Sequence, residues 1–513
     1  MRTFAVVVAL LLAAPLSAGS GNRLTYLDGS DVYHPHRSFP RLVTPAWVGE
    51  KDVEAVVILG IDDMRGVQPW ENYLRPVLER LKKIDGRAPV SIMTCQIDPA
   101  EPHLQRWLKE GVSLETHTID HPCPLLGRGG LETARSTFDR CVDLLHRVPN
   151  NRPVAFRTPC CDSQNTPSPR FFAEIFNRVT PGGNHLAIDT SVFNVPTAND
   201  PEVPREWVME STGRERFRKY LPSASPFGNF IEDYPYPYVI NRRCWEFPCA
   251  TPSDWQGQHR HGVASPLTLA DMKASLDIAV RKQGVFCLVF HPYGWMSPAQ
   301  VVALIDHAVA RYGPKVKFLT FREAHERLVK NLLAGQPLRS ADGGDNGVRL
   351  LDLDGDGFMD VVIGNDWLRQ TRRWQPRTGT WAVSDFPAAI VTGSKDAGAR
   401  FGVLHADGRA SLLTDTVWGY SEKGWERQAD GRAGLEVDGM PVNVVEAGRD
   451  RGVRLRDLDG DGVCELLVGN ERHNAAFAWT GNGWRRLPFA LPDGARLADA
   501  AGRDAGLRLR RSR

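Results

Sequence analysis

The sequence predicts an α/β protein, a distorted (β/α) barrel followed by an all-β region of propeller-type repeats. From residue 51 to about residue 335, short apolar runs alternate with amphipathic segments. This is the pattern of strands joined by helical crossovers. Beyond residue 346 the helical pattern stops and a motif rich in glycine and aspartate recurs. These observations divide the chain into a barrel region, residues 51–335, a polar linker, residues 336–345, and a repeat region, residues 346–513.

The expected strands of the barrel region are short and apolar. They span residues 53–60, 89–93, 112–116, 153–156, 185–188, 285–291 and 316–320, and helices are expected at 70–84, 102–110, 267–282, 297–312 and 321–333. In a barrel of parallel strands, the functional groups lie at the carboxyl ends of the strands. Asp62, His117, Arg157 and His291 each lie at or just past such an end. We therefore expect these four side chains to share one rim.

Composition bounds the class of protein. The chain has 513 residues, of which 42% are hydrophobic, so it is long enough for two or three domains with real cores. Its formal net charge is only +2, and no long basic run precedes residues 508–513. Composition thus gives no reason to expect nucleic acid or an anionic membrane as a partner.

The N-terminus has the pattern of a signal peptide. Residues 1–18 begin with Arg2, continue through an apolar core and end in small residues. The apolar core is too short for a retained membrane anchor, which is the rival interpretation. We expect cleavage after residue 18, an N-terminal extension over residues 19–50, no membrane span after cleavage, and a secreted, periplasmic or cell-surface protein.

Nine cysteines in an exported chain favour some disulfides, and the odd number leaves at least one thiol unpaired within the chain. Cys244 and Cys249 are close enough in sequence to close a small loop. Cys123 is expected near the adjacent Cys160 and Cys161, where a bridge would stiffen the site, although the sequence does not fix the pairing. Buried thiols are expected at Cys95, Cys141, Cys287 and Cys464.

Two histidines and two aspartates indicate a metal site. His117 and His121 are four residues apart, so on one helical turn both imidazoles would face the same ion. Asp62 and Asp63 follow the apolar run 55–60 and supply an oxygen ligand plus a spare carboxylate. Together they predict a hydrolytic metal centre.

The segment 193–262 interrupts the alternation of strands and helices with many aromatic residues. Aromatic faces stack on sugar rings, so these side chains are candidates for a saccharide groove, and a small core that folds a long loop is the slightly favoured alternative. The candidates are Tyr234, Tyr236, Tyr238, Trp245 and Trp255.

The repeat region carries two acidic loops with the spacing of a calcium site. The stretch from Gly347 to Gly357 is nearly repeated from Gly452 to Gly462, and a degraded copy lies between them. A fourth copy begins at Gly502 and is cut short, so we expect an incomplete propeller or a truncated C-terminus. The calcium candidates are Asp352, Asp354, Asp356 and Asp360 in the first loop, and Asp457, Asp459, Asp461 and Glu465 in the second. Solvated acidic turns without an ion are the alternative. These repeats resemble the FG-GAP/VCBS family, whose blades form β-propellers in secreted proteins.

The order of motifs in the barrel region resembles another family. Asp-Asp after a first strand, His-Thr-x-x-His after a third, Arg-x-Pro after a fourth and a late strand ending in His291 are similar to the polysaccharide deacetylases of carbohydrate esterase family four. The resemblance implies removal of N- or O-acetyl groups from an acetylated polysaccharide with a divalent metal, often Zn²⁺. A catalytically inactive glycan-binding protein and a hydrolase of a non-glycan amide are the alternatives.

The resemblance also implies residue roles. Asp63, His117 and His121 match the metal ligands, Asp62 the general base, His291 the general acid and Arg157 the residue that orients the base. Pro159, Cys160 and Trp295 are expected to contact substrate, and Asp189 is the candidate partner of the catalytic histidine, although it lacks the Trp expected downstream. The chain departs from the pattern at Gly60-Ile61, Met64, Cys160 and Val289. These changes bear on the glycan accepted rather than on the reaction.

Overall fold

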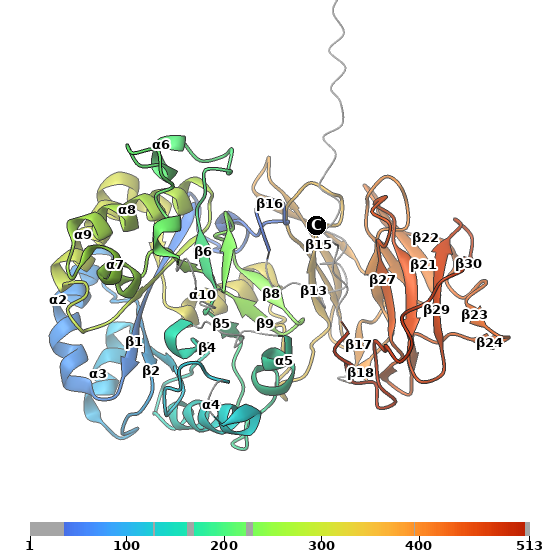
Figure 1. Ribbon diagram of the computed structural model, residues 1–513, viewed down its shortest axis with the longest axis horizontal. Helices are drawn as coiled ribbons and strands as arrows, with labels where there is room; N and C mark the ends of the chain where they lie inside the picture. The colour runs from blue at the N-terminus through green and yellow to red at the C-terminus, as the bar shows by residue number, and fades with distance from the viewer. Residues whose placement is uncertain (1–34, 127–128, 162–168, 222–228, 394, 508–513) are drawn as a thin grey trace, which may run out of the picture.

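The computed structural model describes residues 35–126, 129–161, 169–221, 229–393 and 395–507 (Figure 1). The expected signal peptide and the chain end at residues 508–513 lie outside these ranges. Within them, no helix is both long and apolar enough to cross a membrane.

One twelve-stranded sheet forms the frame of the barrel region, and all its neighbouring strands are parallel except β8 and β9. Strand β1, Ala55–Met64, pairs with β11 along one edge and with β12 and β2 along the other. Nine of its ten residues are buried, as expected for a parallel strand covered on both faces. The remaining strands are β2 (Val90–Thr94), β3 (Ser113–Thr116), β4 (Ala155–Phe156), β5 (Ile188–Asp189), β6 (Phe193–Val195), β7 (Phe230–Glu232), β8 (Tyr238–Ile240), β9 (Cys244–Glu246), β10 (Cys249–Ala250), β11 (Val285–Phe290) and β12 (Val316–Phe318).

The sheet is an open, curled half-barrel and not the closed barrel that the alternation of elements allows. Its order is β7-β6-β10-β11-β1-β2-β3-β4-β5-β9-β8, and no pairing joins β7 to β8 among the described residues. The outer strands come from the aromatic-rich segment 193–262, which adds strands of two or three residues without a regular helical crossover. The distortion of the predicted barrel lies in this segment.

All five expected helices form, and they lie on the outside of the sheet. They are α2 (Val67–Asp85), α3 (Pro102–Glu110), α8 (Pro266–Arg281), α9 (Pro298–Tyr312) and α10 (Phe321–Arg327), the last continued by a π-helical turn at Leu328–Leu332. Figure 1 shows α2, α3, α8 and α9 on the side of β1 away from the repeat region. Four further α-helices of the described residues were not predicted: α4 (Gly130–His146), α5 (Pro169–Phe171), α6 (Arg205–Val208) and α7 (Asp254–His261). In α4 the buried positions Ala134, Phe138, Cys141 and Leu145 follow a helical period that the sequence does display.

The repeat region is all-β and consists mainly of three antiparallel sheets of four strands each, lying beyond the half-barrel in Figure 1. Each sheet is a meander in which neighbours in sequence pair. The strands are β13 (Val348–Leu351), β14 (Asp360–Gly364), β15 (Arg369–Gln375) and β16 (Thr380–Asp385); β19 (Arg400–Gly402), β20 (Ser411–Leu413), β21 (Thr416–Ser421) and β22 (Gly424–Asp430); and β27 (Val453–Arg456), β28 (Glu465–Gly469), β29 (Asn474–Trp479) and β30 (Trp484–Arg486). Closure into a propeller stays a prediction.

The segment predicted as a linker packs tightly against the half-barrel. The buried guanidinium of Arg339 donates hydrogen bonds to the backbone carbonyl oxygens of Phe176 and Leu186, both at 3.0 Å. In the first sheet of the repeat region, the indole of Trp381 donates to the carbonyl oxygen of Ala46, which precedes β1, at 3.0 Å. The linker and the first sheet of the repeat region therefore each contact residues 35–335.

Candidate metal centre

Asp62 and Asp63 lie at the carboxyl end of β1, where the pairing with β2 is interrupted by a register shift between Ile61 and Met64. Such a bulge re-aims the side chains that follow a strand. Asp63 adopts a left-handed backbone conformation with φ of 71°. This strained geometry, unusual for a non-glycine residue, turns the two neighbouring carboxylates toward different partners.

His117 and His121 lie in the loop after β3, and the helical turn predicted for them does not form. Thr118 and His121 have positive φ values of 63° and 52°, which no α-helix contains. The two imidazoles nevertheless converge, with ring centroids 5.1 Å apart. The spacing correctly predicted that the rings meet, but the loop, not a helix, brings them together.

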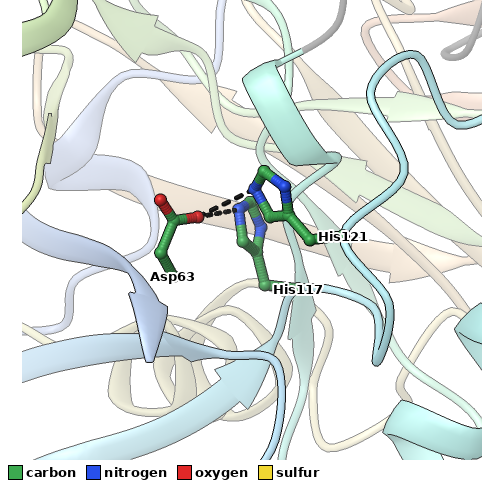
Figure 2. A group of neighbouring side chains, drawn as sticks. All are labelled: Asp63, His117 and His121. Atoms are coloured by element: carbon green, nitrogen blue, oxygen red, sulfur yellow. Dashed lines mark ion pairs between the residues drawn. The ribbon is translucent and has the colours of Figure 1, made fainter. Parts of the chain in front are cut away.

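Asp63, His117 and His121 form a compact set of candidate ligands (Figure 2). Asp63 Oδ1 lies 3.2 Å from His117 Nε2 and 2.8 Å from His121 Nε2. One ligand atom from each residue lies within 4.8 Å of the others. The sequence-predicted ligands are thus brought together at one point.

The protonation of His117 tests whether this set suits a cation. Its Nδ1 lies 2.7 Å from the backbone carbonyl oxygen of Arg157, an acceptor, so Nδ1 carries the proton. In the neutral ring the lone pair of Nε2 then points at Asp63 Oδ1, which also offers lone pairs. Two acceptors at this distance repel unless a cation lies between them. The donor set therefore fits a divalent metal ion such as zinc.

Arg157 holds the second carboxylate. Its guanidinium is fully buried and donates to Asp62 Oδ1 at 2.6 Å and to the carbonyl oxygen of Thr190 at 3.0 Å. A Cβ placed on Gly60 would lie only 2.7 Å from Arg157 Nη1. The departure from the family pattern at Gly60 therefore has a structural reason: glycine leaves room for the guanidinium that orients Asp62.

His291 follows β11 and faces the same site. Its Nε2 lies 3.9 Å from Asp63 Oδ2, while Nδ1 hydrogen-bonds to Asp254 Oδ1 at 2.8 Å. Burial by itself lowers the pKa of His291, but the Asp254 carboxylate, together with the charges of Asp62 and Asp63, outweighs this effect and raises the pKa to about 9. His291 is therefore a cation near neutral pH and can donate a proton.

Asp254, and not Asp189, is the partner of His291. Asp189 is buried beside β4 and accepts a hydrogen bond from the Ser191 hydroxyl at 2.8 Å. Asp254 begins α7 and directly precedes Trp255. The expected Asp with a downstream Trp is therefore present in the sequence, but it lies in the aromatic-rich segment 193–262, which we call the insertion, and not after β5. The Asp254-Trp255 pair is the sequence signal that could have identified the partner of His291.

The cysteines near the site confirm one of the two disulfide expectations. Cys123 and Cys160 form a disulfide that ties the loop after the histidines to the loop after β4. Cys244 and Cys249, by contrast, are free buried thiols, because they belong to the separate strands β9 and β10 of the sheet. The thiols expected to be buried, Cys95, Cys141, Cys287 and Cys464, are all free and buried.

A cavity of about 230 Å³ opens beside the candidate ligands and is lined by Asp62, Asp63, His121 and His291. Of the residues expected to contact substrate, Cys160 and Trp295 line this cavity and Pro159 does not. Trp255 also lines it, whereas the other aromatic candidates of the insertion are packed in the core. Those core residues are Tyr234, Tyr236, Tyr238 and Trp245. The saccharide-groove interpretation therefore fails for these four residues and stays open for Trp255.

The acidic loops of the repeat region also form compact groups. Asp352, Asp354 and Asp356 bring one oxygen each within 4.8 Å of the others, and so do Asp457, Asp459 and Glu465. Two predicted ligands lie outside these groups. Asp360 accepts from the backbone N–H groups of Leu353 and Trp374, and Asp461 from that of Val463.

Residues 49–168, which contain β1 to β4 and the candidate ligands, match the family model described as polysaccharide deacetylase. Over these residues the chain is similar to polysaccharide deacetylases. A search of curated proteins found no match.

Several solved structures are similar to part of this chain at low sequence identity. The peptidoglycan deacetylase PdaC from Bacillus subtilis is 17% identical, with 50% of this chain and 94% of that chain covered and a TM-score of 0.21. A family 4 carbohydrate esterase from Streptomyces lividans in complex with acetate is 14% identical, with 52% and 91% covered and a TM-score of 0.27. The PuuE allantoinase is 12% identical, with 59% and 96% covered and a TM-score of 0.37.

Proposed function

We propose that the chain is a secreted or periplasmic metal-dependent hydrolase that removes N- or O-linked acetyl groups from a polysaccharide. The observation that carries this proposal is the convergence of Asp63, His117 and His121 beside a second carboxylate, Asp62, and a cationic histidine, His291. Metal-assisted hydrolysis of an acyl group uses a metal ion, a base and an acid around one carbonyl, and these residues can hold the ion and supply the base and the acid.

Asp63, His117 and His121 would hold the metal ion. Two imidazoles and one carboxylate are a common ligand set of catalytic zinc, which leaves further coordination positions open. When bound, the ion would lower the pKa of a water molecule and polarise the acetyl carbonyl. The backbone carbonyl of Arg157 fixes the tautomer of His117, so its Nε2 is available as a ligand.

Asp62 is the proposed general base. It lies beside the ligand set, with Oδ2 4.0 Å from His117 Nε2, and its other oxygen is held by Arg157. Because Arg157 is itself fixed by Thr190, Asp62 keeps one oxygen directed at the site. It would take the proton of the attacking water as the water oxygen bonds to the carbonyl carbon.

His291 is the proposed general acid. The leaving amine or alkoxide needs a proton as its bond to the carbonyl carbon breaks, and the raised pKa keeps His291 protonated near neutral pH. Asp254 accepts from Nδ1, so Nε2 presents its proton to the site. The products are acetate and the free amine or hydroxyl of the glycan.

The direct test is acetate release from chitin oligomers, peptidoglycan and acetylxylan by the zinc-loaded protein. We expect release from at least one substrate, loss of release with a chelator, and loss in His117→Ala. His307→Ala, a histidine on α9 away from the site, serves as the matched control and should keep full activity. Release by His117→Ala at the wild-type rate would refute the assignment.

We also propose that the repeat region binds two calcium ions and belongs to the FG-GAP/VCBS type. Carboxylates packed as closely as those of Asp352, Asp354 and Asp356 repel one another unless a cation shares them. The guanidinium of Arg373 lies 2.9 Å from Asp354 and neutralises part of this charge. The support is the repetition of the acidic group at Asp457, Asp459 and Glu465.

A further inference from the structure

The charged residues that line the cavity lie close together beside the candidate metal ligands. They are Asp62, Asp63, His121 and His291. The apolar part of the lining is formed chiefly by Phe193, Tyr220, Leu221, Phe230, Trp255 and Val289, which we call the apolar wall. Most of these residues come from the aromatic-rich segment 193–262, which interrupts the half-barrel. The insertion thus gives the site a hydrophobic extension.

Several polar groups in and around this wall already have partners within the protein. The Tyr220 hydroxyl donates to Asp271 Oδ2 at 2.6 Å, so the ring and not the hydroxyl is left to meet a ligand. Ser253 and Gln256, which also line the cavity, bond each other in the capping box of α7. Asn229 is the remaining uncharged polar residue with an amide among the described lining residues. Hydroxyl groups held against the apolar wall would lose hydrogen bonds to water, whereas a methylene chain in the same place would not.

The cavity is also too large for the methyl group of an acetyl. Its volume is about 230 Å³, whereas about 10–15 Å³ by the same measure is enough to hold one water molecule, which is about the size of a methyl group. A methyl group would leave most of the apolar wall without a partner. Apolar surface that a ligand covers contributes to binding in proportion to its area.

We propose that this site hydrolyses amides or esters with an acyl chain longer than acetyl, and that the chain lies against the apolar wall. The inference rests on the proposed function, since the carbonyl must lie between Asp62 and His291 for the chain to point into the cavity. The water oxygen bonds to the carbonyl carbon, the C–N or C–O bond breaks, Asp62 accepts the proton of the water and His291 protonates the leaving atom. The products are a medium-chain carboxylate and an amine or alcohol.

The test uses chitotriose N-acylated with acetyl, butanoyl or hexanoyl groups and the zinc-loaded full chain, with free amines measured after hydrolysis. We expect kcat/KM to rise about tenfold or more from acetyl to hexanoyl, because each added methylene is buried. A value of kcat/KM that stays level or falls with chain length, while acetyl is still released, would overturn the inference and leave the proposed function intact. No release from any member of the series would overturn both.

Two variants locate the effect in the cavity. Leu221→Trp and Phe193→Trp add bulk to the apolar wall and should each lower the ratio of kcat/KM for hexanoyl to that for acetyl about tenfold. Leu267→Trp is the matched control, because Leu267 is 59% exposed on α8 and lies outside the cavity, and its ratio should equal that of the wild type. An unchanged ratio in both wall variants, with folding verified by circular dichroism, would overturn the inference.

A binding measurement checks the same idea without turnover. Calorimetry with the metal-free protein compares hexanamide with acetamide, two neutral probes that differ only in chain length. We expect hexanamide to bind at least tenfold more tightly, and Leu221→Trp to reduce this difference. Equal affinity for the two amides would contradict the proposed role of the apolar wall.

Discussion

The carboxylate of Asp254 makes two hydrogen bonds to His291. Its Oδ1 lies 2.8 Å from Nδ1 of the imidazole ring, and its Oδ2 accepts a hydrogen bond from the backbone N–H of His291 at 2.7 Å. Because Asp254 begins α7 and His291 directly follows β11, this double contact ties the segment 193–262 to the sheet beside the proposed acid. The contact fixes both the tautomer and the orientation of the ring.

Replacing Asp254 should change the pH dependence of hydrolysis. The carboxylate raises the pKa of His291 to about 9, so in the wild type kcat/KM should fall as pH rises through that region. In Asp254→Asn the pKa of His291 returns toward its ordinary value near 6.5, and the alkaline limb should move to lower pH. At pH 8 we expect about a 10- to 100-fold loss. Asp277→Asn, which removes the partner of His307 outside the site, is the matched control. An unmoved alkaline limb in Asp254→Asn would exclude this role.

Gly60→Ala should displace Arg157 and thereby disturb the position of Asp62. The added Cβ would lie 2.7 Å from Arg157 Nη1, and the guanidinium has no room to retreat because Asp62 and Thr190 hold it. We expect a free energy of unfolding lower by about 1–3 kcal/mol and activity reduced at least tenfold. Gly66→Ala is the control, since Gly66 is extended and nothing lies within 4 Å of its Cβ position. The melting temperature and the rate of acetate release are measured for both variants. Equal values for Gly60→Ala and Gly66→Ala would contradict the packing of Gly60 against Arg157.

The strand and helix pattern of the half-barrel was predictable because buried parallel strands and amphipathic helices leave strong periodic signals, as in β1 and α2. The position of Asp254 was not, because the contact with His291 spans 37 residues and depends on how an irregular insertion folds back. The loop geometry at Thr118 and His121 was equally hidden, since positive φ values at non-glycine residues arise from tertiary constraints. Sequence identified the candidate ligands, whereas the fold supplied their conformation.

The disulfide between Cys123 and Cys160 should stabilise the domain. It closes a loop between residues 37 apart in sequence, so its loss should lower the free energy of unfolding by about 2–5 kcal/mol. The double variant Cys123→Ser/Cys160→Ser should melt at lower temperature than the wild type. A mild reductant should lower the melting temperature of the wild type and leave the double variant unchanged. A reductant effect of equal size in both proteins would show that this bridge is not the stabilising one.

Calcium should stabilise the repeat region. At a concentration of 100 times its dissociation constant, an ion that binds only the folded state adds about 2.7 kcal/mol per site. Removal with a calcium chelator should therefore lower the melting temperature, and Asp352→Asn/Asp457→Asn should abolish the difference. Asp407→Asn, in the degraded copy, is the matched control and should keep it. A wild-type melting temperature that is the same with and without calcium would contradict the two proposed sites.

The central claim is tested most directly by the rate of acetate release as zinc is added back to metal-stripped protein, in excess calcium and with a glycan substrate that the wild type accepts. The expected rate rises from background and levels off at one zinc per chain, while Asp63→Asn stays at background. A rate that is the same with and without zinc, or an Asp63→Asn variant that titrates like the wild type, would contradict a catalytic metal held by Asp63, His117 and His121.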